Sequence, residues 1–127
     1  MARVLLYNFS EDSRRRTVKE ILFRFGIPSR EIPADRQGAP LGRLLELSGF
    51  EGKEEAPEKP FTEEMIVLHD LSARQFHGFL DEMRRRGIRV PLKAAVTEEN
   101  VHWSSFRLCR ELQAEHEALA GKTEGRV

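Results

Sequence analysis

The chain has 127 residues and a mass of 14.7 kDa, a size that usually forms one compact domain. Lysine and arginine together number 21, as do aspartate and glutamate, so no net charge attracts the protein to nucleic acid or to an anionic membrane. A single cysteine, Cys109, excludes an internal disulfide and fits a reducing compartment. No stretch offers the about 20 apolar residues that cross a bilayer. We therefore expect one cytoplasmic domain over residues 1–127, outside the membrane.

The first half, residues 1–48, predicts a strand, a helix, a weaker strand and a short helix. The apolar run 3–9 is typical of a buried strand, and Ser10 is the expected cap of a helix that ends at Gly26. In residues 27–32, Pro28 and the following Pro33 remove backbone donors, which predicts an edge strand or no strand. A short helix follows from Pro40.

Residues 49–64 are acidic and contain proline, which predicts a linker or mobile loop. The second half, residues 65–120, then repeats the order of the first. A strand over 65–71 precedes a helix whose capping box pairs Ser72 with Gln75. A strand over 90–96 and a longer helix complete it, and we expect the helix to turn four side chains inward: Trp103, Phe106, Cys109 and Leu112.

The two halves resemble each other. Residues 4–10 align without a gap on residues 66–72, and Gly26 with Ile27 falls on Gly87 with Ile88 after one skipped residue. This pattern indicates a duplicated βαβα unit. The alternative is that any two such segments share strand ends and caps for general physical reasons.

These elements predict an α/β fold with a small, mainly parallel four-stranded sheet, for which an α+β fold with a split or mixed sheet is the alternative. In strand order 2-1-3-4, the winding reverses between the first strands of the two halves, and a crevice is expected beyond their carboxyl ends. The polar residues that follow the strands would line it, each with an alternative structural role in a cap or turn. The predicted ligand-binding residues are Asn8, Ser10, Arg15, Ser72, Thr97, Asn100 and Trp103.

His69 and Asp70 are the candidate catalytic residues, because a carboxylate next to an imidazole can orient it and raise its basicity. Neighbouring residues on a strand point to opposite faces, however, so a structural histidine is the alternative. We expect no metal and no cofactor. His102 and His116 are about 21 Å apart along a helix, and no glycine-rich phosphate loop is present.

Two arginine triplets differ in their expected roles. Arg84 to Arg86 end a helix, where the helix dipole favours cations. Arg14 to Arg16 begin a helix, where the dipole disfavours them, so they indicate an anionic ligand or acidic partner, with the general abundance of arginine as the alternative explanation.

Residues 65–119 carry a strand that ends in His69 and Asp70, a Lys-Ala-Ala-Val-Thr strand ending at Thr97, and an Asn-x-x-Trp step from Asn100 to Trp103. In these features the chain resembles an uncharacterised bacterial family of short proteins that carry a domain of unknown function. The resemblance implies a bacterial, cytoplasmic setting and no particular chemistry. The first strand and helix are also similar to the start of a response-regulator receiver domain, but Asn8 stands where such a domain needs an acid, so phosphotransfer is not expected.

We therefore predict a noncatalytic binding or regulatory module that recognises a small anion or a protein partner at the crevice. The first alternative is a small enzyme with His69 as general acid or base and Asn100 holding an oxyanion. A second alternative is weak nucleic-acid binding through Arg14 to Arg16. An exposed sheet edge also makes a homodimer plausible.

Overall fold

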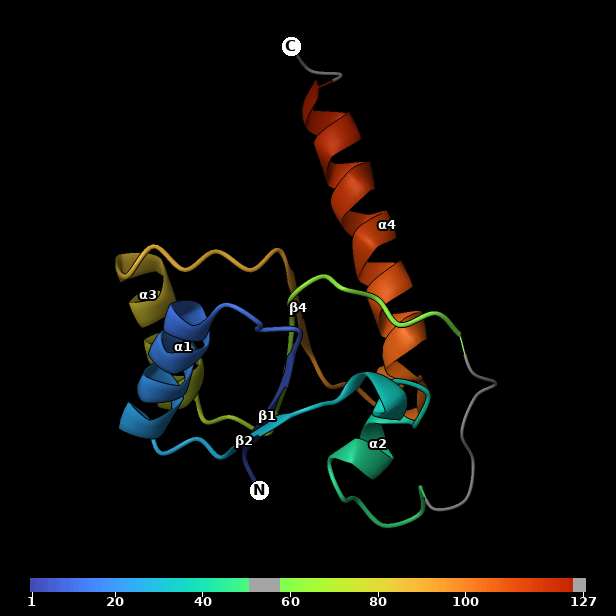
Figure 1. Ribbon diagram of the computed structural model, residues 1–127, viewed down its shortest axis with the longest axis horizontal. Coiled ribbons are helices and arrows are strands. Elements are labelled where there is room, and N and C mark those ends of the chain that lie inside the picture. The colour runs from blue at the N-terminus through green and yellow to red at the C-terminus, as the bar shows by residue number, and fades with distance from the viewer. Residues whose placement is uncertain (51–57, 125–127) are drawn as a thin grey trace. The chain divides into compact units, whose positions relative to one another are not determined.

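A computed structural model describes residues 1–50 and 58–124 (Figure 1). They belong to two compact units, one formed by Met1–Pro33 with Thr62–Val96 and the other by Ala34–Phe61 with Thr97–Val127. Each unit thus takes segments from both halves of the chain. The loop predicted over 49–64 includes residues 51–57, which lie outside the described residues.

The first unit contains a four-stranded mixed sheet. Its strands are β1 (Arg3–Tyr7), β2 (Ser29–Glu31), β3 (Met65–His69) and β4 (Leu92–Ala95), in the order β2-β1-β3-β4. The pairs β1–β2 and β3–β4 are parallel, whereas β1 and β3 are antiparallel. The strand order is therefore as predicted, and the mixed sheet agrees with the alternative prediction.

The mixed sheet has a physical reason. Within each half, a short strand-helix-strand crossover forces the two strands to run in the same direction. Between β2 and β3 the chain passes through more than thirty residues, which can return it to either end of the sheet. Nothing in that connection requires β3 to be parallel to β1.

Helices α1 (Asp12–Arg24) and α3 (Ala73–Arg85) pack against each other and against one face of the sheet (Figure 1). Alternate residues of β1 and β3 face these helices, as the period of a strand requires. The core contains Val4, Leu6, Phe9, Val18, Ile21, Leu22, Ile27, Ile66, Leu68, Phe79, Met83 and Val90. The intervening residues Leu5 and Val67 are also fully buried, so the central strands are buried on both faces.

The two strand-helix segments correspond closely in geometry. Leu5 and Val67, which the sequence alignment makes equivalent, are also direct partners in the antiparallel pair, so a local twofold rotation relates the segments at this point. Both helices have 13 residues. Left-handed backbone conformations recur at equivalent positions, with φ of 64° at Asn8, 56° at Asp70, 65° at Gly26 and 71° at Gly87. These correspondences are geometric, and the duplication itself stays a prediction.

The second unit contains the short helices η1 (Ala34–Arg36), α2 (Leu41–Leu44) and η2 (Asn100–His102), and the longer α4 (Ser105–Glu124). The backbone N–H of Leu41 donates to the carbonyl of Trp103 at 2.9 Å, which joins α2 to the segment before α4. Trp103 thus precedes α4, and the prediction that placed it in this helix was wrong.

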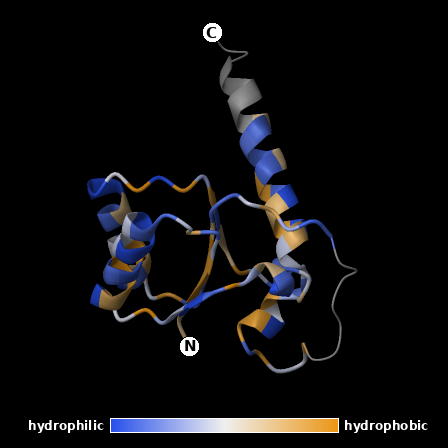
Figure 2. Ribbon diagram, viewed as in Figure 1, coloured by the Kyte–Doolittle hydropathy of each residue, from blue (hydrophilic) through white to orange (hydrophobic). Residues whose placement is uncertain are grey.

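Hydrophobic side chains are concentrated in the first turns of α4, where Phe106, Leu108 and Cys109 are buried. The following described turns are mainly hydrophilic (Figure 2). No helix within residues 1–50 and 58–124 combines the length and the apolar composition that crossing a membrane requires.

Candidate functional site

The carboxyl ends of β1 and β3 lie at opposite ends of the sheet, because these neighbouring strands are antiparallel. Asn8 and Ser10 follow β1 at one end, and His69, Asp70 and Ser72 follow β3 at the other. The predicted crevice between the two first strands is therefore not formed. Its remaining members, Thr97, Asn100 and Trp103, belong to the second compact unit.

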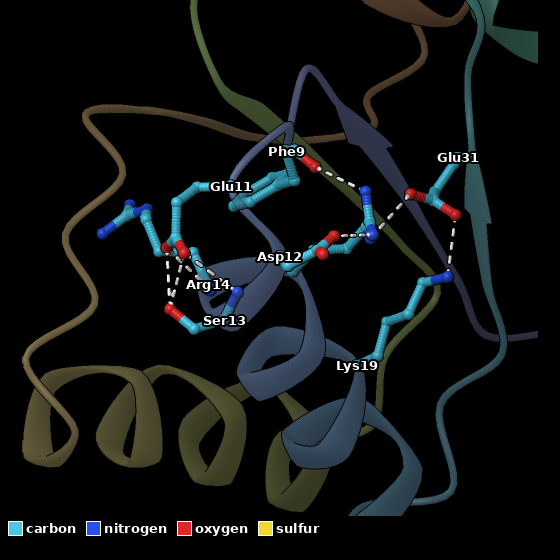
Figure 3. A network of polar contacts seen from close by, with 8 residues as sticks. Phe9, Glu11, Asp12, Ser13, Arg14, Lys19 and Glu31 are labelled. Atoms are coloured by element: carbon cyan, nitrogen blue, oxygen red, sulfur yellow. Dashed lines mark hydrogen bonds and ion pairs between the residues drawn. The ribbon is translucent and has the colours of Figure 1, made fainter.

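At the β1 end, Glu11 and not Ser10 caps helix α1. The Glu11 carboxylate accepts hydrogen bonds from the backbone N–H groups of Ser13 and Arg14, each at 3.0 Å, and from the Ser13 hydroxyl (Figure 3). The Ser13 hydroxyl and these two amides lower the pKa of Glu11. Ser10 is exposed, so the prediction that Ser10 caps the helix was wrong. Asn8 donates from Nδ2 to the carbonyl of Glu63 at 2.9 Å.

The first arginine triplet is largely compensated by acidic neighbours. Arg14 holds Glu64 through two hydrogen bonds, of 3.0 Å from Nε and 2.6 Å from Nη2, and this carboxylate raises the pKa of Arg14. Arg15 pairs with Asp12, and its Nε lies 4.0 Å from a Glu31 oxygen (Figure 3). These carboxylates explain why cations are tolerated at a helix start, and they occupy the guanidinium groups that were predicted to bind an anion.

At the β3 end, the expected catalytic pair is not assembled. The Asp70 carboxylate accepts a hydrogen bond from the amino group of Met1 at 2.5 Å, and this contact lowers the pKa of Asp70. Partial burial lowers the pKa of His69, against the opposing effect of the Asp70 charge. In the part of the chain that the structure describes, no hydrogen bond joins the two side chains.

Ser72 forms the predicted capping box with Gln75 at the start of α3. The Ser72 hydroxyl accepts from the Gln75 backbone N–H at 3.1 Å, and the Gln75 side chain accepts from the Ser72 N–H at 3.0 Å. Ser72 thus caps α3, and ligand binding by Ser72 stays a prediction.

The remaining predicted residues, in the second unit, also have local partners. Thr97 and Asn100 form a reciprocal pair, in which each side chain accepts from the other residue's backbone N–H, at 2.8 and 3.0 Å. The guanidinium of Arg107 lies 4.3 Å from the centre of the Trp103 ring, a cation–π contact. Ligand binding by these residues stays a prediction.

The structure brings together a different group of side chains, in a pocket of about 450 Å³ between the end of α3 and β4. Met83 is buried, Leu80 and Ile88 are half-buried, and the three cationic residues are exposed. We call this site the α3–β4 pocket. It is lined by Leu80, Met83, Arg84, Gly87, Ile88, Arg89 and Lys93.

The cations of this pocket differ in their partners. Arg84 forms an ion pair with Asp81 at 2.5 Å. Arg89 and Lys93 make no side-chain hydrogen bond or ion pair with any described residue. Two positively charged groups thus stand without a local counter-charge beside an apolar surface, which is the composition that suits an anion with an apolar part.

Backbone groups do not add to this anion site. The N–H groups of Gly87 and Ile88 donate to the carbonyls of Arg84 and Met83, at 3.1 and 2.9 Å, which is the usual way of closing a helix end. The end of a helix also carries partial negative charge. An anion would therefore be held by the side chains of Arg89 and Lys93.

Sequence reasoning missed this pocket because it treated Arg84 to Arg86 only as a favourable helix end. One available signal was the sequence after the helix, where Arg89 and Lys93 surround the apolar Val90 and Leu92 without an acidic residue among them. Leu80 and Met83 line the pocket because of the way α3 packs against the sheet, and the sequence alone did not show this packing.

Comparison with known proteins finds a family match for the part of the chain that contains the pocket. Residues 64–119 match the family described as Domain of unknown function (DUF3783). These residues form a DUF3783 domain. No curated protein matches the chain, and no solved structure does. All seven residues that line the α3–β4 pocket lie within DUF3783.

The DUF3783 domain crosses the boundary between the two compact units. It contributes β3, α3 and β4 to the first unit, and η2 with most of α4 to the second. Among the described residues, no group of three or more His, Cys, Asp and Glu side chains is placed to hold a metal ion.

Proposed function

We propose that the chain is a noncatalytic binding module, and that its α3–β4 pocket recognises an anionic group with an adjoining apolar part. The observation that carries the proposal is the pair of cations, Arg89 and Lys93, which have no acidic partner among the described residues and stand beside Leu80 and Met83. In the same unit, Arg14, Arg24 and Arg85 form ion pairs with carboxylates. Arg16 and Arg74 also have no acidic partner among the described residues, but they do not line the pocket. An external anion would supply the missing counter-charge.

The proposed ligand is still an anion, as predicted from the sequence. The proposed site is the α3–β4 pocket and no longer the crevice. The predicted crevice needed two parallel first strands, whereas the pocket needs only α3, β4 and the turn between them. A cytoplasmic setting is part of the proposal and is supported by Cys109, the single cysteine of the chain, which is buried and forms no disulfide. The enzyme alternative has less support, because Asp70 binds the Met1 amino group instead of His69.

A thermal-shift experiment on the full chain tests the proposal. The panel compares octanoate, benzoate and hexyl phosphate with acetate and inorganic phosphate. We expect the ligands with an apolar part to raise the melting temperature, because they cover the apolar wall as well as meeting the cations.

Charge-neutralising variants locate the site. Arg89→Gln and Lys93→Gln should each weaken binding of the amphiphilic anion about tenfold, since a hydrogen bond to a charged group contributes about 1.5–3 kcal/mol. Arg74→Gln is the matched control, because Arg74 is an exposed arginine of α3 that does not line the pocket. A panel without any stabilising anion, or an equal loss in the control, would contradict the proposal.

A further inference from the structure

We infer that the natural occupant of the α3–β4 pocket is an acidic segment of a protein partner that inserts one apolar side chain. The inference rests on the proposed function and deepens it, because it names the class of ligand. It is carried by the arrangement of charge and apolar surface in the pocket.

The pocket is too large for a simple inorganic anion. Its volume is about 450 Å³, many times that of one water molecule, which is about 30 Å³. An ion such as phosphate would leave most of the water in place over Leu80, Met83 and Ile88. An apolar side chain would displace the water and gain the free energy of covering these residues.

The charges stand at the rim and not at the bottom. The side chain of Arg84 is 80% exposed, and Arg89 and Lys93 are exposed as well, whereas Met83 is buried. Small-molecule sites usually enclose most of the ligand and fix it with polar groups inside the cavity. An apolar centre with a solvated charged rim is instead typical of a protein–protein contact, where one anchor side chain is surrounded by polar contacts.

Charge complementarity selects an acidic partner. Rim cations attract acidic segments over a distance and increase the rate of association more than the final affinity. A nucleic acid would also be attracted, but the residues that line the pocket include no aromatic side chain on which a base could stack.

The first half of the chain does not repeat this composition. By the correspondence of Gly26 with Gly87, Lys19 occupies the position of Leu80 and Pro28 the position of Arg89. Lys19 is neutralised within the chain, because its Nζ lies 2.7 Å from a Glu31 oxygen. The combination of an apolar wall with two cations that have no acidic partner among the described residues is thus a property of the second half.

Fluorescence anisotropy with labelled peptides tests the inference on the full chain. The first pool contains ten-residue peptides of aspartate and glutamate with a central leucine, isoleucine, phenylalanine or methionine. One control peptide has alanine at the centre, and another has lysine in place of every acidic residue. We expect the acidic pool to bind at least tenfold more tightly than the alanine peptide, because burying one such side chain contributes about 1.5–3 kcal/mol. Its affinity should fall as salt is added.

A charge-reversed protein separates recognition from damage to the fold. The double variant Arg89→Glu with Lys93→Glu should lose the acidic peptides and bind the lysine peptide, an exchange that unfolding cannot produce. Arg74→Glu, at an exposed arginine that does not line the pocket, should leave the binding of the acidic pool unaffected.

The outcomes distinguish the inference from the proposed function. If octanoate stabilises the protein and no peptide binds, the inference is wrong and the proposed function stands. If neither binds, both are wrong. A single-stranded oligonucleotide that binds more tightly than the acidic peptides, and is lost in the double variant, would overturn the inference in favour of nucleic acid.

Discussion

The starts of the two long helices of the sheet unit show how individual residues satisfy the same physical need in different ways. The first N–H groups of a helix have no partner within it. At α3 the Ser72 hydroxyl supplies one acceptor, and Gln75 reaches back to close the capping box. At α1 the two oxygens of Glu11 accept from Ser13 and Arg14. At α1 the longer side chain of Glu11 thus caps the helix. The alignment of the two halves had indicated Ser10, one residue earlier, for this role.

We predict that Ser72→Ala destabilises the protein by about 1 kcal/mol, the usual loss when an N-cap is removed. Ser10→Ala is the matched control and should change the free energy of unfolding by less than about 0.5 kcal/mol, as surface substitutions do. Urea denaturation of both variants measures the difference. Equal losses at the two serines would show that Ser10, and not Glu11, caps α1.

Most polar residues that were predicted to bind a ligand have partners within the chain. Ser72 could be assigned from sequence, because a capping box is recognisable within four residues. The pairing of Thr97 with Asn100 is of the same short range. The ion pair of Arg14 with Glu64 joins residues 50 positions apart, and no local pattern identifies such a partner. Short-range contacts were therefore accessible from the sequence, and long-range ones were not.

At the scale of the elements, α1 and α3 pack closely because a glycine stands at their contact. A Cβ atom added to Gly78 in α3 would overlap the ring of Phe25. Phe79, the next residue, is fully buried in the core. The apolar stripe of α3 was evident from its helical spacing, whereas the contact at Gly78 depended on the position of α1.

We predict that Phe79→Ala destabilises the protein by about 3–5 kcal/mol, because it removes a buried ring and leaves a cavity. Phe23→Ala removes the same group from α1, where the side chain is 86% exposed, and should change stability by less than about 0.5 kcal/mol. Thermal melts followed by circular dichroism compare the two variants. A similar loss for both would mean that α1 buries Phe23.

At the scale of the whole molecule, the direction of β3 relative to β1 decides which residues can share a site. A parallel pair would have placed Asn8 and Asp70 at the same end of the sheet, and the antiparallel pair places them at opposite ends. In the sheet unit, the α3–β4 pocket combines an apolar wall with cations that have no partner among the described residues.

Backbone nuclear Overhauser effects on isotope-labelled protein test this direction. We expect cross-strand contacts between Arg3 and His69 and between Tyr7 and Met65, which the antiparallel register makes partners. Protons on directly opposed residues of an antiparallel pair lie close enough for such contacts. Contacts of Arg3 with Met65 and of Tyr7 with His69 would instead indicate parallel strands, and would restore the predicted crevice.

The sequence by itself determined three of the strands, the four helices and the parallel pairing within each half. It left residues 27–32 as either an edge strand or no strand, and the structure contains the edge strand β2. These features follow from residues that are close along the chain: apolar periodicity, the capping box at Ser72, and the prolines beside β2. A short crossover also leaves only one direction for the strand that follows it.

Only the tertiary structure decided the direction of β3, the partners of Arg14 and the site of the α3–β4 pocket. The entropy of closing a long connection changes slowly with its length, so the segment between β2 and β3 favours neither direction strongly. The choice is made by the packing of side chains from distant parts of the chain, including the partners Leu5 and Val67 at the centre of the sheet. Such contacts leave no periodic pattern in the sequence.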